Sequence, residues 1–178
     1  MRKHIWQDFI PTYHCVRIFD IPASFFVNQG YQYIFMDLDN TLASFRSKTP
    51  SQEVQSWIKS LTDAHLNLLI VSNNQPLRVE KYVKSLNIPF IAPAGKPSPK
   101  KLKAYIKKQG IHLKKVVFIG DQVLTDCWMA NQLGVDSILT EKLVKEDHWP
   151  TWINRVLEKP IRSWLKNRQL LKNWRDFT

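Results

Sequence analysis

From residue 31 onward, short apolar runs alternate with amphipathic stretches, and this alternation predicts the secondary structure. The apolar runs carry few polar residues at alternate positions, which is typical of strands covered on both faces. Strands are predicted over residues 31–38, 66–74, 88–92, 115–121 and 135–140. Helices are predicted in the stretches between them, over residues 51–65, 76–87, 98–110 and 122–134.

Residues that begin and end helices support these boundaries. Ser51 precedes the first helix as an N-cap, and Pro76 stands in the first turn of the second. Gly110 and Gly134 end the third and fourth helices. The first helix places four apolar residues on one face: Val54, Trp57, Ile58 and Leu61. Strands and helices that alternate in this way predict an α/β fold, a Rossmann-like, doubly wound parallel sheet with right-handed crossovers.

Polar side chains follow three of the predicted strands at their carboxyl ends. Asp37 and Asp39 follow the first strand, Ser72 and Asn73 the second, and Asp121 a later one. In open α/β sheets, ligands bind beyond the carboxyl ends of the strands, near the point where the strand order reverses. These five side chains are therefore candidates for one site.

The pair Asp37 and Asp39 suggests a reaction centre. A carboxylate is ionised near neutral pH, so Asp37 could attack a phosphorus atom without help from a base and form an aspartyl-phosphate. Asp39 could protonate the leaving oxygen and then activate the water that hydrolyses the intermediate. Acids are also common turn residues after strands, so the pair alone does not decide between a turn and a reaction centre.

Asp121 favours the reaction centre. Acids gathered at one sheet edge repel each other unless a cation lies between them, and Mg²⁺ takes carboxylate oxygens together with water and phosphate oxygens. Asp121 and Asp37 fit as its ligands. Asp126 falls in the first turns of the next helix and would orient these ligands without binding the metal itself. The alternative for Asp121 and Asp126 is the general preference of acids for a helix N-terminus.

Other residues could bind a phosphoryl group. Ser72 and Asn73 can donate hydrogen bonds to phosphoryl oxygens, although a simple turn would use the same residues. Lys96 is fixed between a glycine and a proline ahead of a helix, where its ammonium would stabilise a transferring phosphoryl group. Three lysines near the start of that helix are interpreted as a positive field around the mouth of the site: Lys100, Lys101 and Lys103.

Together, these residues resemble the haloacid dehalogenase (HAD) superfamily. Their order matches its four motifs: Asp37-x-Asp39-x-Thr41, Ser72, Lys96, and Gly120-Asp121 followed by Asp126. The resemblance implies that Asp37 is the nucleophile, and that Asp39 is the general acid/base and gives its backbone carbonyl to Mg²⁺. It also implies that Thr41 steadies the loop and belongs with the phosphate-binding residues.

By the same resemblance, Ser72 and Lys96 hold the phosphoryl group, Asp121 binds the metal, and Asp126 supports the site. The gaps from Thr41 to Ser72 and from Ser72 to Lys96 leave no room for the large cap domain of many relatives. We therefore expect an open site, which suits large or membrane-embedded phosphomonoesters.

The details of the motifs are similar to the bacterial YqeG-type phosphatases of HAD subfamily IIIA and to the phosphatidylglycerophosphate phosphatases of mitochondria. The segments concerned are DLDNTL, VSNN, GKPSP and GDQ…TD. This likeness implies removal of the terminal phosphate from phosphatidylglycerophosphate, giving phosphatidylglycerol. The residues alone leave open a phosphatase of nucleic-acid ends or of a soluble phosphometabolite, and a non-catalytic basic scaffold.

The formal net charge of +11 indicates an anionic partner: nucleic acid, a phosphorylated metabolite or an anionic membrane. Basic residues are concentrated in residues 96–115 and 159–178, and the second stretch interleaves them with tryptophan. Apolar residues fall near one helical face of the tail: Ile153, Leu157, Ile161, Trp164, Leu165 and Leu171. Such a helix could lie on an anionic membrane, contact nucleic acid, or pack on its own domain.

Composition divides the 178 residues into an aromatic and basic N-terminal segment (1–30), a phosphatase core (31–145), and a basic, Trp-rich helical tail (146–178). No apolar run is long enough for a transmembrane helix, and the N-terminus lacks the pattern of a signal peptide. Cys15 and Cys127 match no metal or redox spacing. We therefore expect a cytoplasmic protein that contacts the inner face of a bacterial membrane peripherally.

Overall fold

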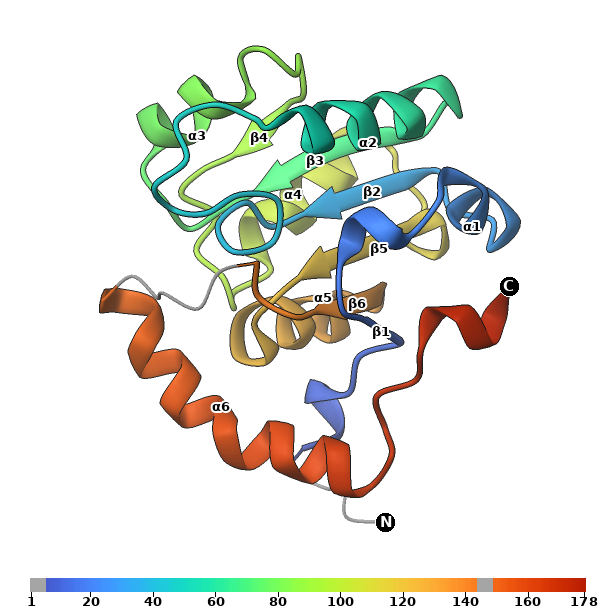
Figure 1. Cartoon of the computed structure of the whole chain (residues 1–178), viewed down its shortest axis with the longest axis vertical. Helices are drawn as coiled ribbons and strands as arrows, with labels where there is room; N and C mark the ends of the chain where they lie inside the picture. Colours follow the sequence, from blue (N-terminus) through green and yellow to red (C-terminus); the bar gives the residue numbers. More distant parts are fainter. Residues whose placement is uncertain (1–5, 144–148) are drawn as a thin grey trace.

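The computed structural model describes residues 6–143 and 149–178, with side chains described again from residue 156. In this part of the chain, six parallel strands form one sheet in the order β1-β6-β5-β2-β3-β4 (Figure 1). Their bounds are Tyr13–Cys15 (β1), Tyr33–Met36 (β2), Asn67–Val71 (β3), Phe90–Ile91 (β4), Val116–Gly120 (β5) and Asp136–Thr140 (β6). The predicted doubly wound parallel sheet is confirmed.

Helices follow the strands on both faces. Their bounds are Ala23–Asn28 (α1), Gln52–Asp63 (α2), Pro76–Val83 (α3), Lys100–Lys108 (α4), Trp128–Leu133 (α5) and Trp149–Asn167 (α6). Shorter helical turns are Gln7–Phe9 (η1), Ile18–Asp20 (η2), Leu113–Lys115 (η3), the π-helical Val123–Cys127 (η4) and Trp174–Phe177 (η5). The predicted N-cap is confirmed, because the Ser51 hydroxyl accepts a hydrogen bond from the Val54 backbone N–H. Described residues hold no helix that is long and apolar enough to cross a membrane.

The four central strands, β6, β5, β2 and β3, are buried on both faces because their side chains alternate between two cores. Ile34 of β2 shares one core with Leu61 of α2, and α1 and α3 cover the same face. Phe35, the next residue along β2, belongs to the opposite core with Leu102 of α4 and Met129 of α5. Residues 37–51 and 72–75 connect β2 to α2 and β3 to α3, so neither connection holds a large cap.

Three local features differ from the predicted elements. The helix α1 lies before residue 31, where no helix was predicted. Tyr13–Cys15 forms the edge strand β1, with Tyr13 opposite Ile138 of β6; three residues are too short to show a strand pattern in the sequence. The helix predicted over residues 122–134 begins as the π-helix η4 and continues as α5. Gly134 ends it as predicted, with a φ of 73° that favours glycine.

The tail helix α6 packs on the domain along part of its length. Ile161 and Leu165 are buried against Leu139 of β6 and against Val123 and Cys127 of η4. Other residues of the predicted apolar stripe behave differently: Leu157 is 58% exposed, and Ile153 lies outside the residues whose side chains are described. The predicted boundary between residues 145 and 146 also lies outside the described residues.

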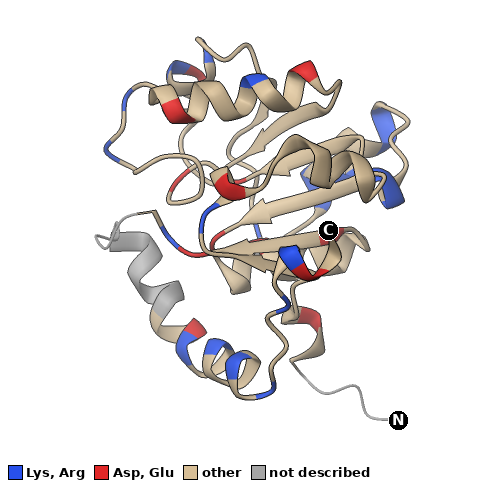
Figure 2. Cartoon of the chain, turned by 45° about the vertical axis from the view of Figure 1, so that its right-hand side comes forward, with Lys and Arg blue, Asp and Glu red and all other residues tan. Residues whose placement is uncertain are grey.

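The basic residues do not form one continuous field. Those of the tail lie along the second half of α6 (Figure 2) and in the residues that follow it: Lys159, Arg162, Lys166, Arg168, Lys172 and Arg175. Those of residues 96–115 are divided by α4. Lys100, Lys101 and Lys103 begin this helix near the carboxyl edge of the sheet, whereas Lys114 and Lys115 directly precede β5 at the opposite edge.

Candidate active site

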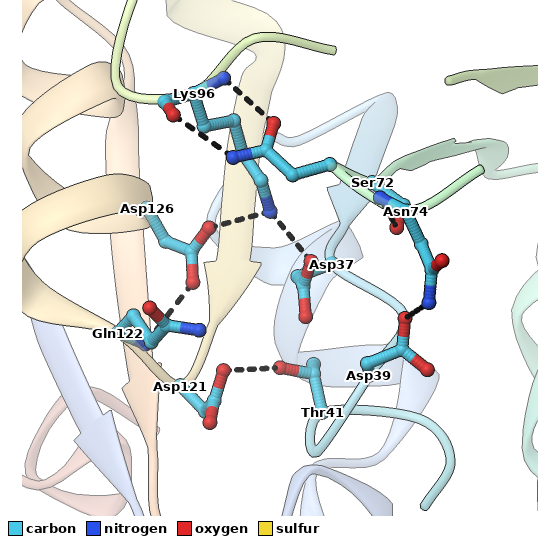
Figure 3. A network of polar contacts seen from close by, with 10 residues as sticks. Asp37, Asp39, Thr41, Ser72, Asn74, Lys96, Asp121, Gln122 and Asp126 are labelled. Carbon is cyan, nitrogen blue, oxygen red and sulfur yellow. Dashed lines mark hydrogen bonds and ion pairs between the residues drawn. The ribbon is translucent and has the colours of Figure 1, made fainter. Parts of the chain in front are cut away.

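The order of the strands brings the predicted site residues together at one sheet edge (Figure 3). Asp37 follows β2, Ser72 follows β3, and Asp121 follows β5, and β2 lies between the other two strands. The chain runs outward in both directions from β2 and β5, which makes their junction the point where the strand order reverses. The Asp37 backbone N–H donates to the Ile119 carbonyl at 2.8 Å, which continues the β2–β5 pairing up to the site.

A buried ammonium group lies at the centre of this edge. Lys96 Nζ is 2.5 Å from Asp37 Oδ1 and 2.7 Å from Asp126 Oδ1. Contacts between a charged donor and carboxylates at these distances are the strong class of hydrogen bond. Lys96 is only 7% exposed, so these contacts are shielded from water.

Asn73 fixes the backbone of Lys96. Its side-chain oxygen accepts from the Lys96 N–H at 2.8 Å, and its side-chain nitrogen donates to the Lys96 carbonyl at 2.9 Å. The sequence predicted that this amide would bind phosphate. In the structure both of its polar atoms bind the Lys96 backbone, so Asn73 fixes the position of Lys96.

Three buried carboxylates face the site: Asp37, Asp121 and Asp126 each offer an oxygen within 4.8 Å of the others. Burial raises the pKa of Asp37 well above its usual value; Lys96 lowers it in part, and Asp126 and Asp121 raise it further. Burial alone would lower the pKa of Lys96, but the carboxylates outweigh it and raise this pKa. One ammonium does not neutralise three carboxylates, so the cluster is suited to a hard divalent cation.

Asp126 lies closer to the site than the sequence indicated. Its second oxygen accepts from the Gln122 backbone N–H at 3.0 Å, which orients the carboxylate toward Lys96. Gly120 makes room for it, because a Cβ at that position would lie 2.3 Å from the Asp126 carboxyl carbon. The Thr41 hydroxyl donates a hydrogen bond to Asp121 Oδ1 at 3.5 Å, which joins the loop after β2 to the loop after β5.

Asp39 is held by two residues that the sequence did not single out. Asn74 Nδ2 donates to one of its oxygens at 3.0 Å, and Arg78 Nη2 donates to the other at 3.2 Å. Arg78 also donates to the carbonyls of Ser44 and Phe45, so it joins the acid to the loop after β2. The sequence did offer a signal for Arg78: it is a basic residue in the first turn of a helix that begins at the carboxyl edge of the sheet.

Ser72 is buried at the end of β3, and its hydroxyl oxygen accepts from the Asn74 N–H at 3.1 Å. Its hydroxyl proton can therefore be donated to a phosphoryl oxygen. Two residues of α6, Glu158 and Arg162, also contact the segment after β5 and were not predicted.

Comparison with known proteins agrees with this geometry. Residues 5–145 match the family described as mitochondrial PGP phosphatase. YqeG of Bacillus subtilis, described as a probable phosphatase, is 31% identical over 160 residues, which are 90% of this chain and 93% of YqeG. The chain belongs to the PGP phosphatase family. It is a YqeG-like phosphatase of the HAD superfamily, as the motifs predicted.

Solved structures with the same fold have low sequence identity. A hypothetical protein of Xanthomonas campestris has a TM-score of 0.53 and 19% identity, over 71% of this chain and 72% of its own. A Streptomyces avermitilis protein assigned to the HAD hydrolases has a TM-score of 0.52 and 20% identity, over 63% of this chain and 72% of its own. These likenesses concern the fold alone.

Proposed function

We propose that the chain is a Mg²⁺-dependent phosphomonoesterase that works through an aspartyl-phosphate on Asp37. The observation that carries this proposal is the buried contact between the Asp37 carboxylate and the Lys96 ammonium. It lies at the carboxyl edge, where open parallel sheets bind ligands. A nucleophile beside a fixed positive charge is what the transfer of a charged phosphoryl group requires.

The reaction has two steps in this proposal. First, an Asp37 oxygen forms a bond to phosphorus, the bond to the leaving oxygen breaks, and Asp39 gives that oxygen a proton. Then Asp39 takes a proton from water, whose oxygen bonds to phosphorus while the Asp37–phosphorus bond breaks and phosphate leaves. Lys96 offsets the charge of the phosphoryl oxygens in both steps, and Ser72 donates a hydrogen bond to one of them.

The metal would be held by the acidic cluster. Asp37 and Asp121 offer buried carboxylate oxygens, Asp126 completes the cluster, and by resemblance the Asp39 backbone carbonyl is a further ligand. Mg²⁺ prefers such oxygen ligands and, when bound, neutralises the charge of phosphoryl oxygens. A divalent cation also keeps Asp37 ionised, because it opposes the effects that raise its pKa.

The proposed substrate is phosphatidylglycerophosphate. The family description supports this choice, and so does the connection between β2 and α2, which is too short for a large cap domain. A headgroup that projects from a bilayer can reach an open sheet edge without leaving the membrane. The protein would then contact an anionic membrane peripherally, at the cytoplasmic face, and its net charge of +11 favours that contact.

A panel of substrates tests the proposal. We expect phosphate release to be fastest from phosphatidylglycerophosphate in vesicles, compared with phosphorylated oligonucleotides and sugar phosphates. Asp37→Asn should lower turnover of a generic aryl phosphate about a thousandfold or more, because no nucleophile remains. Asp63→Asn is the matched control, since Asp63 is an exposed acid of α2.

Three outcomes would contradict the proposal. Preference for either soluble class over the lipid would contradict the substrate. Absence of aryl-phosphate turnover with Mg²⁺ present would contradict the enzyme and favour a basic scaffold. Equal activity of the Asp37→Asn and Asp63→Asn variants would contradict the aspartyl-phosphate.

A further inference from the structure

The tail helix α6 reaches the loop that carries Asp121, although the family match ends at residue 145, before this helix. Arg162 donates a hydrogen bond from Nη2 to the backbone carbonyl of Asp121. It also donates from Nε to Oε2 of Glu158, 3.2 Å away. A residue of the tail is therefore bonded to the backbone of a member of the acidic cluster.

Glu158 makes a second connection to the same segment. Its side chain is fully buried, and its Oε1 accepts from the Leu124 backbone N–H at 2.9 Å. Leu124 lies in the first turn of η4, where N–H groups have no partner within the helix. A buried carboxylate needs both a charge partner and hydrogen-bond donors, and Arg162 and Leu124 supply them.

Apolar packing fixes the two charged residues in place. Ile161 and Leu165 lie on either side of Arg162 in the sequence, and both are buried against Val123 and Leu139. Val123 itself is part of η4, which follows directly from Asp121 and Gln122. Both apolar packing and hydrogen bonds from α6 therefore fix the position of the loop that carries Asp121.

We propose that α6 is part of the catalytic centre, and that Arg162 and Glu158 are positioning residues that hold Asp121 where the metal site needs it. The inference rests on the proposed metal site. Groups that orient metal ligands from behind change metal affinity or activity about 10- to 100-fold when they are replaced. Arg162 acts in this way on the backbone carbonyl of Asp121. The Thr41 hydroxyl holds the same residue by a side-chain oxygen.

The experiment compares Arg162→Gln with Arg168→Gln, the same exchange at an exposed position of the tail. Two quantities are measured: the Mg²⁺ concentration for half-maximal aryl-phosphate turnover, and the rise in melting temperature that Mg²⁺ causes. We expect Arg162→Gln to raise the half-maximal Mg²⁺ concentration about 10- to 100-fold and to reduce the Mg²⁺-induced rise in melting temperature. Arg168→Gln should change neither quantity. Arg162→Lys, which keeps a cationic donor, should restore part of the loss.

The outcomes separate this inference from the metal proposal. Wild-type turnover that needs no Mg²⁺ would overturn the metal site, and this inference with it. A Mg²⁺ response in wild type that is unchanged in Arg162→Gln would overturn the positioning role alone. If Arg162→Gln does not fold, Glu158→Gln takes its place, because it keeps an acceptor for Leu124 and loses the ion pair. If Glu158→Gln and Arg168→Gln responded to Mg²⁺ in the same way, the inference would also be overturned.

Discussion

Asp37 and Lys96 occupy a buried position where three carboxylates face one ammonium. Because the pKa of Asp37 is higher in the folded protein than in the unfolded chain, folding favours its protonated form. Without metal, the contribution of Asp37 to stability is therefore fully present below the ordinary pKa of 3.8 and is lost as the pH rises through the raised value. A bound cation reverses this preference. In the proposed mechanism, ionisation of Asp37 has a free-energy cost that a bound metal would offset.

Stabilisation by Mg²⁺ should therefore depend on pH. We expect the Mg²⁺-induced rise in melting temperature to be larger at about pH 8 than at about pH 5, since protons compete with the metal for the carboxylates. Without metal at about pH 8, Asp37→Asn should melt above wild type, and this difference should close as the pH falls. Thermal unfolding across pH measures both effects, with Asp63→Asn as control. A Mg²⁺ shift that is the same at every pH would contradict the raised pKa.

At the scale of elements, α6 has two kinds of apolar residue. Leu165 is fully buried against β6 and η4, whereas Leu157, two turns earlier, is 58% exposed. Helices of this type derive most of their stability from the packing of one face. The packed part of α6 therefore contributes to the folding of the domain, and the exposed residues are available for another contact.

The two leucines of α6 give a matched pair of variants. Leu165→Ala should lower the free energy of unfolding by about 2 to 5 kcal/mol, because it leaves a cavity between α6, β6 and η4. Leu157→Ala should change it by about 0.5 kcal/mol or less, as is usual for exposed positions. Urea unfolding curves measure both values. Similar values for the two variants would show that α6 does not depend on this packing.

On the scale of the whole molecule, the site edge of the sheet carries exposed apolar residues. Val16 follows β1 and is 63% exposed, and Leu77 begins α3 after β3 and is 68% exposed. Arg46 and Lys48 are exposed in the connection between β2 and α2, at the same edge. If the substrate is the proposed phospholipid, an anionic bilayer would contact this apolar and basic surface around the site. The opposite edge carries its own exposed residues, Val27 and Leu113, which serve as controls.

Charge substitutions at the two edges should separate these surfaces. The double variant Val16→Glu/Leu77→Glu should weaken co-sedimentation with anionic vesicles about tenfold or more, because one buried Leu contributes about 1.5 to 3 kcal/mol. Turnover of a soluble aryl phosphate should stay unchanged. Val27→Glu/Leu113→Glu adds the same charge at the far edge and should bind vesicles like wild type. Equal loss in both double variants would point to net charge rather than a docking edge.

Local patterns in the sequence determined most of the elements and the candidate residues for the proposed chemistry. Apolar runs define the strands of the core, Ser51 and Gly134 mark helix ends, and the acids after β2 and β5 are visible as motifs. These features depend on residues close together in the chain. The short elements before residue 31 were exceptions: the helix α1 was not predicted, and neither was the edge strand β1, whose hydrogen bonds to β6 come from a segment more than a hundred residues away.

Contacts between distant residues were decided only by the tertiary structure. Asn73 has the same local pattern whether it binds phosphate or the Lys96 backbone, and only the fold places the two together. The hydrogen bonds from Arg78 to Asp39 and from Arg162 to the Asp121 carbonyl likewise join distant segments, and no periodic pattern in the sequence predicts them. The sequence by itself determined which groups are candidates for the chemistry, because side-chain type and local conformation are local properties. Which groups hold them in place depends on packing, and that became visible only in three dimensions.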